Sequence, residues 1–129
     1  MGTTILIVDD HAPVRTLVRA IVAREPDLQV VGEAGDGAEA IRLTHALRPD
    51  IIVLDVAMPR VNGLDALRRI KAAHPETKVV IVTMHSEDAY REAAEEGGAD
   101  AFLVKKTLTT TLLPTIRRID GAGSPPTIP

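Results

Sequence analysis

Short hydrophobic runs alternate along the chain with longer segments in which apolar residues recur at helical spacing. The runs are rich in Val and Ile, and they are continuous rather than interrupted by polar residues. This pattern is typical of strands that are buried on both faces of a sheet. We therefore expect strands at residues 5–8, 29–34, 51–54, 79–82 and 101–104.

The segments between the runs predict helices. After Pro13, which suits a first helical turn, the apolar residues at positions 14, 17, 18, 21 and 22 share one helical face. Asp36 followed by Glu39 resembles a capping box for a helix that ends near Leu47. Further helices are expected from Gly63 to His74, from Ser86 to the Gly97-Gly98 pair, and from about Thr110 to Ile119.

The last helix contains a proline, and a different kind of segment follows it. Pro114 lacks a backbone donor, so this helix is expected to start late, near Thr111. Beyond residue 120 the segment GAGSPPTIP has no apolar periodicity, which indicates a linker or a disordered tail at 121–129. A chain of 129 residues fits one domain, here residues 1–120. Strands that alternate with helices predict an α/β fold with a parallel sheet and helices on both faces.

Composition narrows the functional classes. The chain has no cysteine, which excludes disulfides and thiolate metal sites, and its apolar runs are too short to cross a bilayer. A cytoplasmic protein without membrane contact is expected. A formal charge of −3 and 2% aromatic residues argue against direct nucleic-acid binding. The pairs Arg68-Arg69 and Arg117-Arg118 are interpreted as solvated helix faces.

Polar residues follow the hydrophobic runs where the predicted strands end. Asp9 and Asp10 follow the first run and Asp55 the third, while Thr83 and Lys105 follow the fourth and fifth. In a five-stranded sheet of order 2-1-3-4-5, ligands bind beyond the carboxyl ends of the neighbouring first and third strands. Clustered carboxylates suit a hard cation such as Mg²⁺. The Asp pair alone would also fit turn chemistry after a strand, but the joint pattern favours a binding site.

Five stretches carry a family resemblance: ILIVDDH, VVGEAGDG, RPDIIVLDVAMPRVNG, VVIVTMH and GADAFLVKK. Through them residues 4–119 resemble the receiver domain of two-component response regulators, and the LDxxMPxxxG pattern from Leu54 to Gly63 is the most specific. The resemblance implies a flavodoxin-like fold with five flanking helices and sheet order 2-1-3-4-5. The VVGEAGDG and RPD segments look most like the NarL/FixJ subfamily, in which a LuxR-type helix-turn-helix output domain is expected downstream.

The resemblance assigns roles at the phosphorylation site. Asp55 matches the phosphoacceptor, which takes a phosphoryl group from a phosphohistidine of a sensor histidine kinase. Asp10 and Asp55 match direct Mg²⁺ ligands, Asp9 acts mainly through bound water, and the backbone carbonyl of Ala57 completes the protein ligands. Lys105 supplies positive charge to the phosphoryl group.

The resemblance also implies a switch. Thr83 matches the residue whose hydroxyl moves toward the phosphoryl group, and Phe102 matches the aromatic that fills the vacated space. The surface of the fourth helix, fifth strand and fifth helix then displays the change. The plainer interpretation is that Thr83 ends a strand and that Phe102 is simply part of the core.

Three positions depart from the common pattern of the family or vary within it. Many receivers have proline after the lysine, whereas this chain has Lys105-Lys106, for which a trans peptide is expected. Ala57 and His85 match positions that tune the lifetime of the phosphoryl group. The four histidines show no metal-ligand spacing along the sequence.

The leading hypothesis is a phosphorylation-controlled module that has no external metabolite as substrate. It contacts DNA only through an output domain absent from this chain, and it allows a homodimer on phosphorylation. Alternatives are a stand-alone phosphorelay receiver, a degenerate receiver that acts as a scaffold, and a phosphatase with an aspartate nucleophile. A flavodoxin-like cofactor carrier would need a Ser/Thr/Gly-rich phosphate loop and flanking aromatics, and the sequence has neither.

Overall fold

Strands and helices alternate along the chain in a computed structural model that describes residues 2–56, 62–84 and 88–122. The strands are β1 (Thr3–Val8), β2 (Leu28–Ala34), β3 (Ile51–Asp55), β4 (Lys78–Thr83) and β5 (Ala101–Val104). The helices are α1 (Ala12–Ala23), α2 (Gly37–Leu47), α3 (Gly63–Ala73), α4 (Asp88–Glu96) and α5 (Leu108–Ala122). Every predicted strand is confirmed, to within a few residues at its ends.

The strands form one parallel sheet in the order β2-β1-β3-β4-β5, as predicted. The chain order reverses at β1, whose neighbours are β2 and β3. Here the connections leave toward opposite faces, and in open α/β sheets ligands bind at such a point, beyond the carboxyl ends of β1 and β3. The β1–β2 register shifts between Ile5 and Leu6, and the shift lies far enough from this edge to leave the pairing of Val8 with Ala34 regular.

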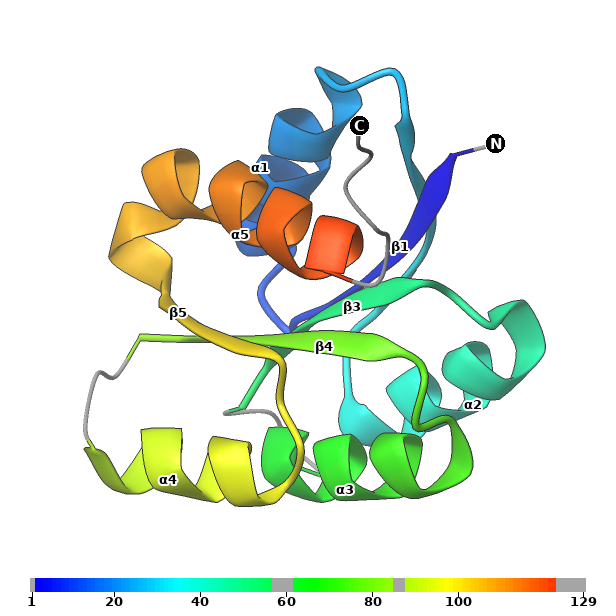
Figure 1. Cartoon of the computed structure of the whole chain (residues 1–129), viewed down its shortest axis with the longest axis vertical. Coiled ribbons are helices and arrows are strands. Elements are labelled where there is room, and N and C mark those ends of the chain that lie inside the picture. The colour runs from blue at the N-terminus through cyan, green and yellow to red at the C-terminus, as the bar shows by residue number, and fades with distance from the viewer. Residues whose placement is uncertain (1, 57–61, 85–87, 123–129) are drawn as a thin grey trace.

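Two helical layers cover the sheet. Helices α1 and α5 cover one face, and α2, α3 and α4 cover the other (Figure 1). Because successive strand residues point to opposite faces, Ile5 and Ile7 pack under α1 and α5, whereas Leu6 and Val8 pack toward α2 and α3. Burial on both faces explains why the strands read as continuous apolar runs.

Side-chain caps set the starts of α2 and α3. Asp36 accepts a hydrogen bond from the backbone N–H of Glu39 at 2.8 Å, as the capping box predicts, while the Glu39 carboxylate accepts from the N–H of Gly35. Asn62, which the sequence interpretation missed, caps α3 by accepting from the N–H of Asp65. The predicted cap at Ser86 lies outside the described residues.

The start of α5 was predicted wrongly. The helix begins at Leu108 rather than near Thr111, directly after a 3-10 turn at Lys105–Thr107. Leu108 and Leu112 are both buried in the core between the sheet and α1, so packing favours helix in spite of Pro114. At its other end α5 reaches Ala122, beyond residue 120, the domain boundary predicted from the sequence.

Polar contacts fasten α5 to the rest of the domain. Arg117 forms ion pairs with Asp27 and Glu25 in the connection between α1 and β2. The hydroxyl of Thr3 donates to Asp120 at 2.9 Å. The Asp27 carboxyl has a lowered pKa, chiefly because it accepts hydrogen bonds from Arg117. Arg117 is exposed, in agreement with the interpretation of these arginines as a solvated helix face.

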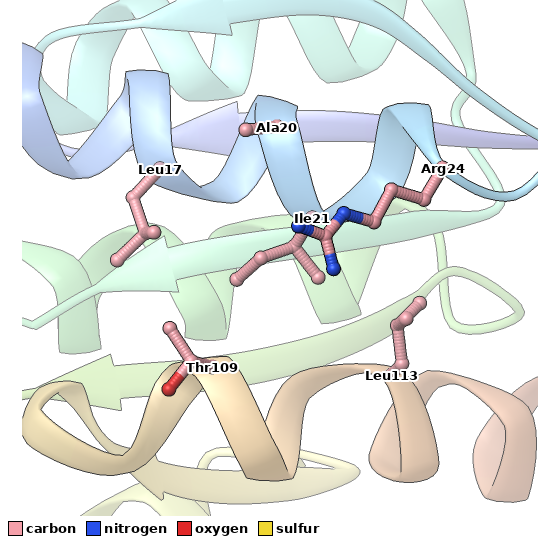
Figure 2. Close-up of a pocket in the computed structure, with 6 residues that line it drawn as sticks. All are labelled: Leu17, Ala20, Ile21, Arg24, Thr109 and Leu113. Atoms are coloured by element: carbon pink, nitrogen blue, oxygen red, sulfur yellow. The ribbon is translucent and has the colours of Figure 1, made fainter.

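A groove separates α1 from α5 on the outer surface (Figure 2). It is lined by Leu17, Ala20, Ile21 and Arg24 of α1 and by Thr109 and Leu113 of α5. Among the described residues, no helix is long and apolar enough to span a membrane.

Candidate functional site

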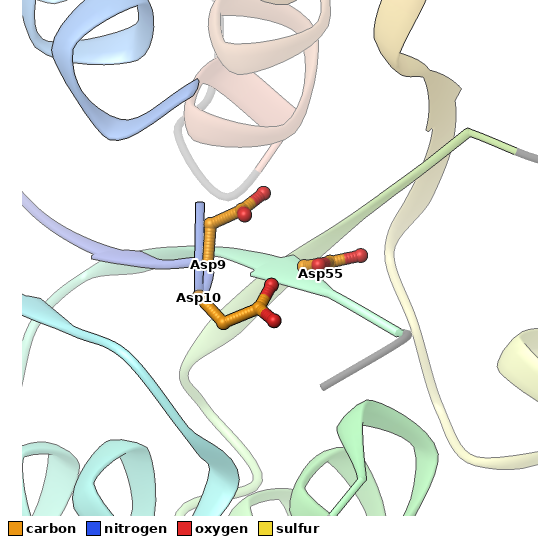
Figure 3. A group of neighbouring side chains, drawn as sticks. All are labelled: Asp9, Asp10 and Asp55. Carbon is orange, nitrogen blue, oxygen red and sulfur yellow. The ribbon is translucent and has the colours of Figure 1, made fainter. Parts of the chain in front are cut away.

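Three carboxylates meet where β1 and β3 end. Asp9 and Asp10 follow β1, and Asp55 is the last residue of β3. One oxygen from each lies within 4.8 Å of the others (Figure 3). Asp9 and Asp55 are each only 3% exposed, whereas Asp10 is exposed to solvent. The structure thus brings together the three acidic residues that the sequence analysis placed at this edge.

Every polar atom of Asp9 has a partner. Its N–H donates to the carbonyl of Ala34, and its side-chain Oδ1 accepts from the N–H of His11 at 2.8 Å. Its Oδ2 lies 2.8 Å from Nζ of Lys105, and its backbone carbonyl accepts from Nη1 of Arg15. Asp9 is therefore held rigidly, and it has little capacity left to bind an ion directly.

Lys105 faces the two buried carboxylates from the end of β5. Its Nζ lies 2.8 Å from Asp9 and 3.4 Å from Asp55, and its side chain is only 10% exposed. Burial alone would lower the pKa of Lys105, but the hydrogen bond that its ammonium donates to Asp9 and the charges of Asp55 and Asp9 outweigh burial and raise this pKa. The ammonium group therefore stays charged at neutral pH. The peptide after Lys105 is trans, as expected, like all peptides that the structure describes.

Thr83 lies beside this cluster. It is fully buried at the end of β4, and the residue before it, Val82, pairs with Asp55 in the ladder between β3 and β4. On its other side Thr83 pairs with Val104, the residue before Lys105. The sheet therefore places Thr83 between the phosphoacceptor candidate and the lysine.

Phe102 lies two strands away from the acidic cluster, on the face of the sheet covered by α2, α3 and α4. It is half-buried and packs against the core there. The guanidinium of Arg91, on α4, lies 4.6 Å from the centroid of the Phe102 ring. This cation–π contact joins the aromatic to the surface of α4, β5 and α5. No sequence signal pairs these two residues.

Two predicted positions, Ala57 and His85, lie outside the described residues. The histidines show no metal-ligand spacing along the sequence, yet the structure brings the rings of His45 and His74 to 5.8 Å between centroids. Within the described part of the chain, the one group of three or more potential metal ligands is nevertheless the acidic cluster.

Arg15 and Glu33 form a support beneath Asp9 that the sequence interpretation missed. Arg15, on α1, donates to the backbone carbonyl of Asp9 and from Nε to Glu33 on β2 at 3.0 Å. Arg19, one turn further along α1, binds the other oxygen of Glu33. Hydrogen bonds from Arg19 and then from Arg15 overcome the effect of burial and lower the pKa of Glu33. Helical spacing places Arg15 and Arg19 on one face, but only the fold shows that Glu33 lies opposite them.

The cluster suits a divalent cation. Three carboxylates against the single ammonium of Lys105 leave two formal negative charges within one small volume. Mg²⁺ prefers oxygen ligands and retains several waters, and in this cluster one of the three carboxylates, Asp10, is exposed to solvent. The residues of this acidic cluster are therefore compatible with a Mg²⁺ site.

A family model described as "Response regulator receiver domain" matches residues 5–117. This match covers β1 from Ile5 onward, the other four strands and the three carboxylates, and it agrees with the resemblance inferred from the sequence motifs.

Known proteins show the same relationship. The chain is 32% identical over 120 residues to the transcriptional regulatory protein DegU of Brevibacillus brevis, covering 93% of this chain and 51% of DegU. It is 36% identical over 115 residues to the response regulator GacA of Pseudomonas aeruginosa, and this match covers 89% of this chain and 54% of GacA. A solved two-component response regulator of the LuxR family from Aurantimonas sp. SI85-9A1 is 35% identical, with a TM-score of 0.87. This match covers 92% of this chain and 85% of the solved chain. The chain therefore spans about half the length of these curated relatives.

Proposed function

Because the chain belongs to the response regulator receiver family, in which phosphorylation-dependent switching is general, we propose that Asp55 is its phosphoacceptor. The observation that most supports this proposal is the position of Asp55. It is buried at the carboxyl end of β3, beside Asp9, Asp10 and the ammonium of Lys105. A sensor histidine kinase is the proposed phosphoryl donor, as is usual for this family.

In the transfer step an oxygen of Asp55 forms a bond to phosphorus while the bond from phosphorus to the histidine nitrogen breaks. The electron pair stays on the imidazole, and the product is an aspartyl phosphate. Lys105, 3.4 Å from Asp55, neutralises the phosphoryl oxygens, and the Thr83 hydroxyl donates a hydrogen bond to them. Mg²⁺, when bound, supplies further positive charge to the same oxygens.

The acidic residues are proposed to bind the cation in two ways, directly and through water. Asp10 and Asp55 are proposed as direct ligands together with the backbone carbonyl of Ala57. Asp9 is proposed to act through water, because both of its carboxylate oxygens already accept hydrogen bonds. Ala57 and His85, which lie outside the described residues, are proposed to tune the lifetime of the phosphoryl group, as the resemblance implies.

The proposed switch runs from Thr83 to Phe102. A hydroxyl of Thr83 drawn toward a phosphorylated Asp55 leaves space beside β5, which the Phe102 ring can enter. The ring would then leave the guanidinium of Arg91, which now lies 4.6 Å from its centroid. The surface of α4, β5 and α5 would display this change to an output domain.

The downstream output is proposed from the relatives. DegU and GacA are about twice as long as this chain, so a LuxR-type DNA-binding domain after the receiver is the proposed output, with transcription as the regulated process. A homodimer formed on phosphorylation and a cytoplasmic location, usual for the family, complete the proposal. Receivers of this kind are generally not metabolic enzymes, and no external metabolite is proposed as substrate.

Asp55→Asn tests the phosphoacceptor. With acetyl phosphate and MgCl₂ the wild-type chain is expected to gain one acyl phosphate that hydroxylamine releases, and Asp55→Asn is expected to gain none. Intact-protein mass spectrometry measures both. Asp65→Asn, an exposed acidic position on α3, is the matched control and should be modified like the wild type.

The same experiment separates the alternatives. An acyl phosphate that persists in Asp55→Asn contradicts the proposal. Sustained hydrolysis of a phosphate ester such as p-nitrophenyl phosphate would instead favour the phosphatase. A stand-alone phosphorelay receiver remains the second candidate, and the coding sequence that follows Pro129 distinguishes it from a transcription factor.

Phe102→Ala is expected to leave phosphorylation of Asp55 intact while removing most of the response of α4. Backbone amide chemical shifts, compared with and without beryllofluoride and MgCl₂, measure that response. Leu103→Ala is the control, because Leu103 packs toward α1 and α5 on the opposite face of the sheet. Equal shift changes in α4 for Phe102→Ala and wild type would contradict the role of Phe102.

A further inference from the structure

Arg15 reaches the acidic cluster through the main chain rather than through a carboxylate. Its Nη1 donates to the backbone carbonyl of Asp9, and its Nε donates to Glu33 at 3.0 Å. The Arg15 side chain is 23% exposed and that of Glu33 is 31% exposed, so the contact is partly shielded from water. The guanidinium therefore spans α1, β2 and the segment that follows β1.

The carbonyl of Asp9 belongs to the peptide that joins Asp9 to Asp10. Since a peptide unit is planar, holding this oxygen also fixes the orientation of the N–H of Asp10 and the direction in which its Cα leaves. The side chain of Asp9 is held separately by His11 and Lys105. Asp10 is exposed and lies beyond the end of β1, and among the described residues no hydrogen bond or ion pair holds its side chain in this way.

We propose that Arg15, itself held by Glu33, is a positioning residue that fixes Asp10 and thereby sets the Mg²⁺ affinity of the acidic cluster. The proposal rests on the proposed function of this cluster and adds a residue that does not touch the ion. A metal ligand depends on the groups that orient it, and removing such a group typically weakens metal binding about 10- to 100-fold.

If charge were the only effect of Arg15, its removal would change the Mg²⁺ affinity in the opposite direction. Arg15 carries a positive charge close to the site, so its removal should strengthen binding of a divalent cation if charge were its main effect. Positioning predicts weaker binding after the same change. Arg15→Met therefore separates the two effects, and Arg15→Lys adds a variant that keeps the charge but lacks the planar fork that spans two acceptors.

Arg19→Met is the matched control. Arg19 binds the same carboxylate, Glu33, from the next turn of α1, and it makes no described contact with Asp9. Its loss removes one positive charge and one partner of Glu33 while leaving the bond from Arg15 to the Asp9 carbonyl in place. Its Mg²⁺ affinity should stay close to that of the wild type.

The test is titration of each variant of the 129-residue chain with MgCl₂ by isothermal calorimetry, with thermal unfolding in EDTA as a measure of folding. We expect the Kd for Mg²⁺ to rise about tenfold or more in Arg15→Met and Arg15→Lys, and to change less than about twofold in Arg19→Met. An unchanged or lower Kd in both Arg15 variants overturns the inference. If Arg15→Met does not fold, Arg15→Lys decides alone.

The same titrations distinguish failure of the proposed function from failure of the inference about Arg15. A wild-type chain that binds no Mg²⁺ would remove the proposed cation site and this inference together. A wild-type chain that binds Mg²⁺ and is matched by both Arg15 variants would overturn the inference alone, and the phosphoacceptor proposal for Asp55 would stand.

Discussion

Lys105→Met should lower the free energy of unfolding by about 3 kcal/mol in the absence of Mg²⁺. Asp9 and Asp55 expose only 4% of their side chains, and Lys105 is the cation that both contact. Methionine keeps much of the side-chain volume but removes the ammonium group that faces both buried carboxylates. We expect the lower end of the range for broken buried ion pairs, because Asp10 opens the cluster to water.

Urea unfolding followed by circular dichroism, in EDTA and in excess MgCl₂, measures this effect. Mg²⁺ should restore part of the lost stability in Lys105→Met, because the divalent cation supplies the missing positive charge. Lys106→Met is the control: Lys106 is exposed, and its replacement should change the free energy of unfolding by less than about 0.5 kcal/mol. Equal stability of the two variants in EDTA would show that Lys105 does not compensate the cluster.

Gly63→Ala is expected to destabilise the domain by about 3 kcal/mol, the upper end of the usual cost of overpacking. Gly63 begins α3, and its N–H donates to the carbonyl of Val56 at 3.0 Å. A Cβ at this position would overlap the carbonyl oxygen of Asp55 and the Cα of Val56, and it would lie 2.9 Å from the carbonyl carbon of Asp55. Because these are backbone atoms, neither side can yield without moving the end of β3.

The same movement should impair the site. The main chain that must shift carries Asp55, so Gly63→Ala is also expected to weaken beryllofluoride binding in the presence of MgCl₂. Gly35→Ala is the control, because a Cβ there meets its nearest atom, Nη1 of Arg15, only at 3.9 Å. Urea unfolding of both variants gives the comparison, and a Gly63→Ala domain as stable as Gly35→Ala would refute the steric argument.

The sequence predicted the sheet well because a buried strand can be recognised from a short run of neighbouring residues. Each continuous Val- and Ile-rich run is a strand covered on both faces, and β5 matches its predicted range of 101–104 without change. The start of α5 was predicted less well, because Pro114 suggested a delayed helix. The burial of Leu108 and Leu112 against the sheet and α1 decided otherwise, and that burial depends on residues far away in the sequence.

The sequence predicted which residues meet at the site, but it did not predict the contacts that hold those residues in position. The polar strand endings led to Asp9, Asp10, Asp55, Thr83 and Lys105, because parallel strands bring their carboxyl ends to one edge. The bond from Arg15 to the Asp9 carbonyl has no such signal. The crowding at Gly63 was also hidden, since the sequence suggested only a suitable start for α3.

By itself, then, the sequence determined the α/β alternation, the strand order implied by its motifs, and the identity of the residues that meet at the sheet edge. These features follow from hydrophobic runs and from the residues that end them, which are local properties of the chain. Only the tertiary structure decided which carboxylate oxygens are already engaged, which guanidinium holds the main chain of Asp9, and which cation lies over Phe102. Those contacts depend on how the helices pack on the sheet, and that packing is set jointly by residues distributed over the whole domain.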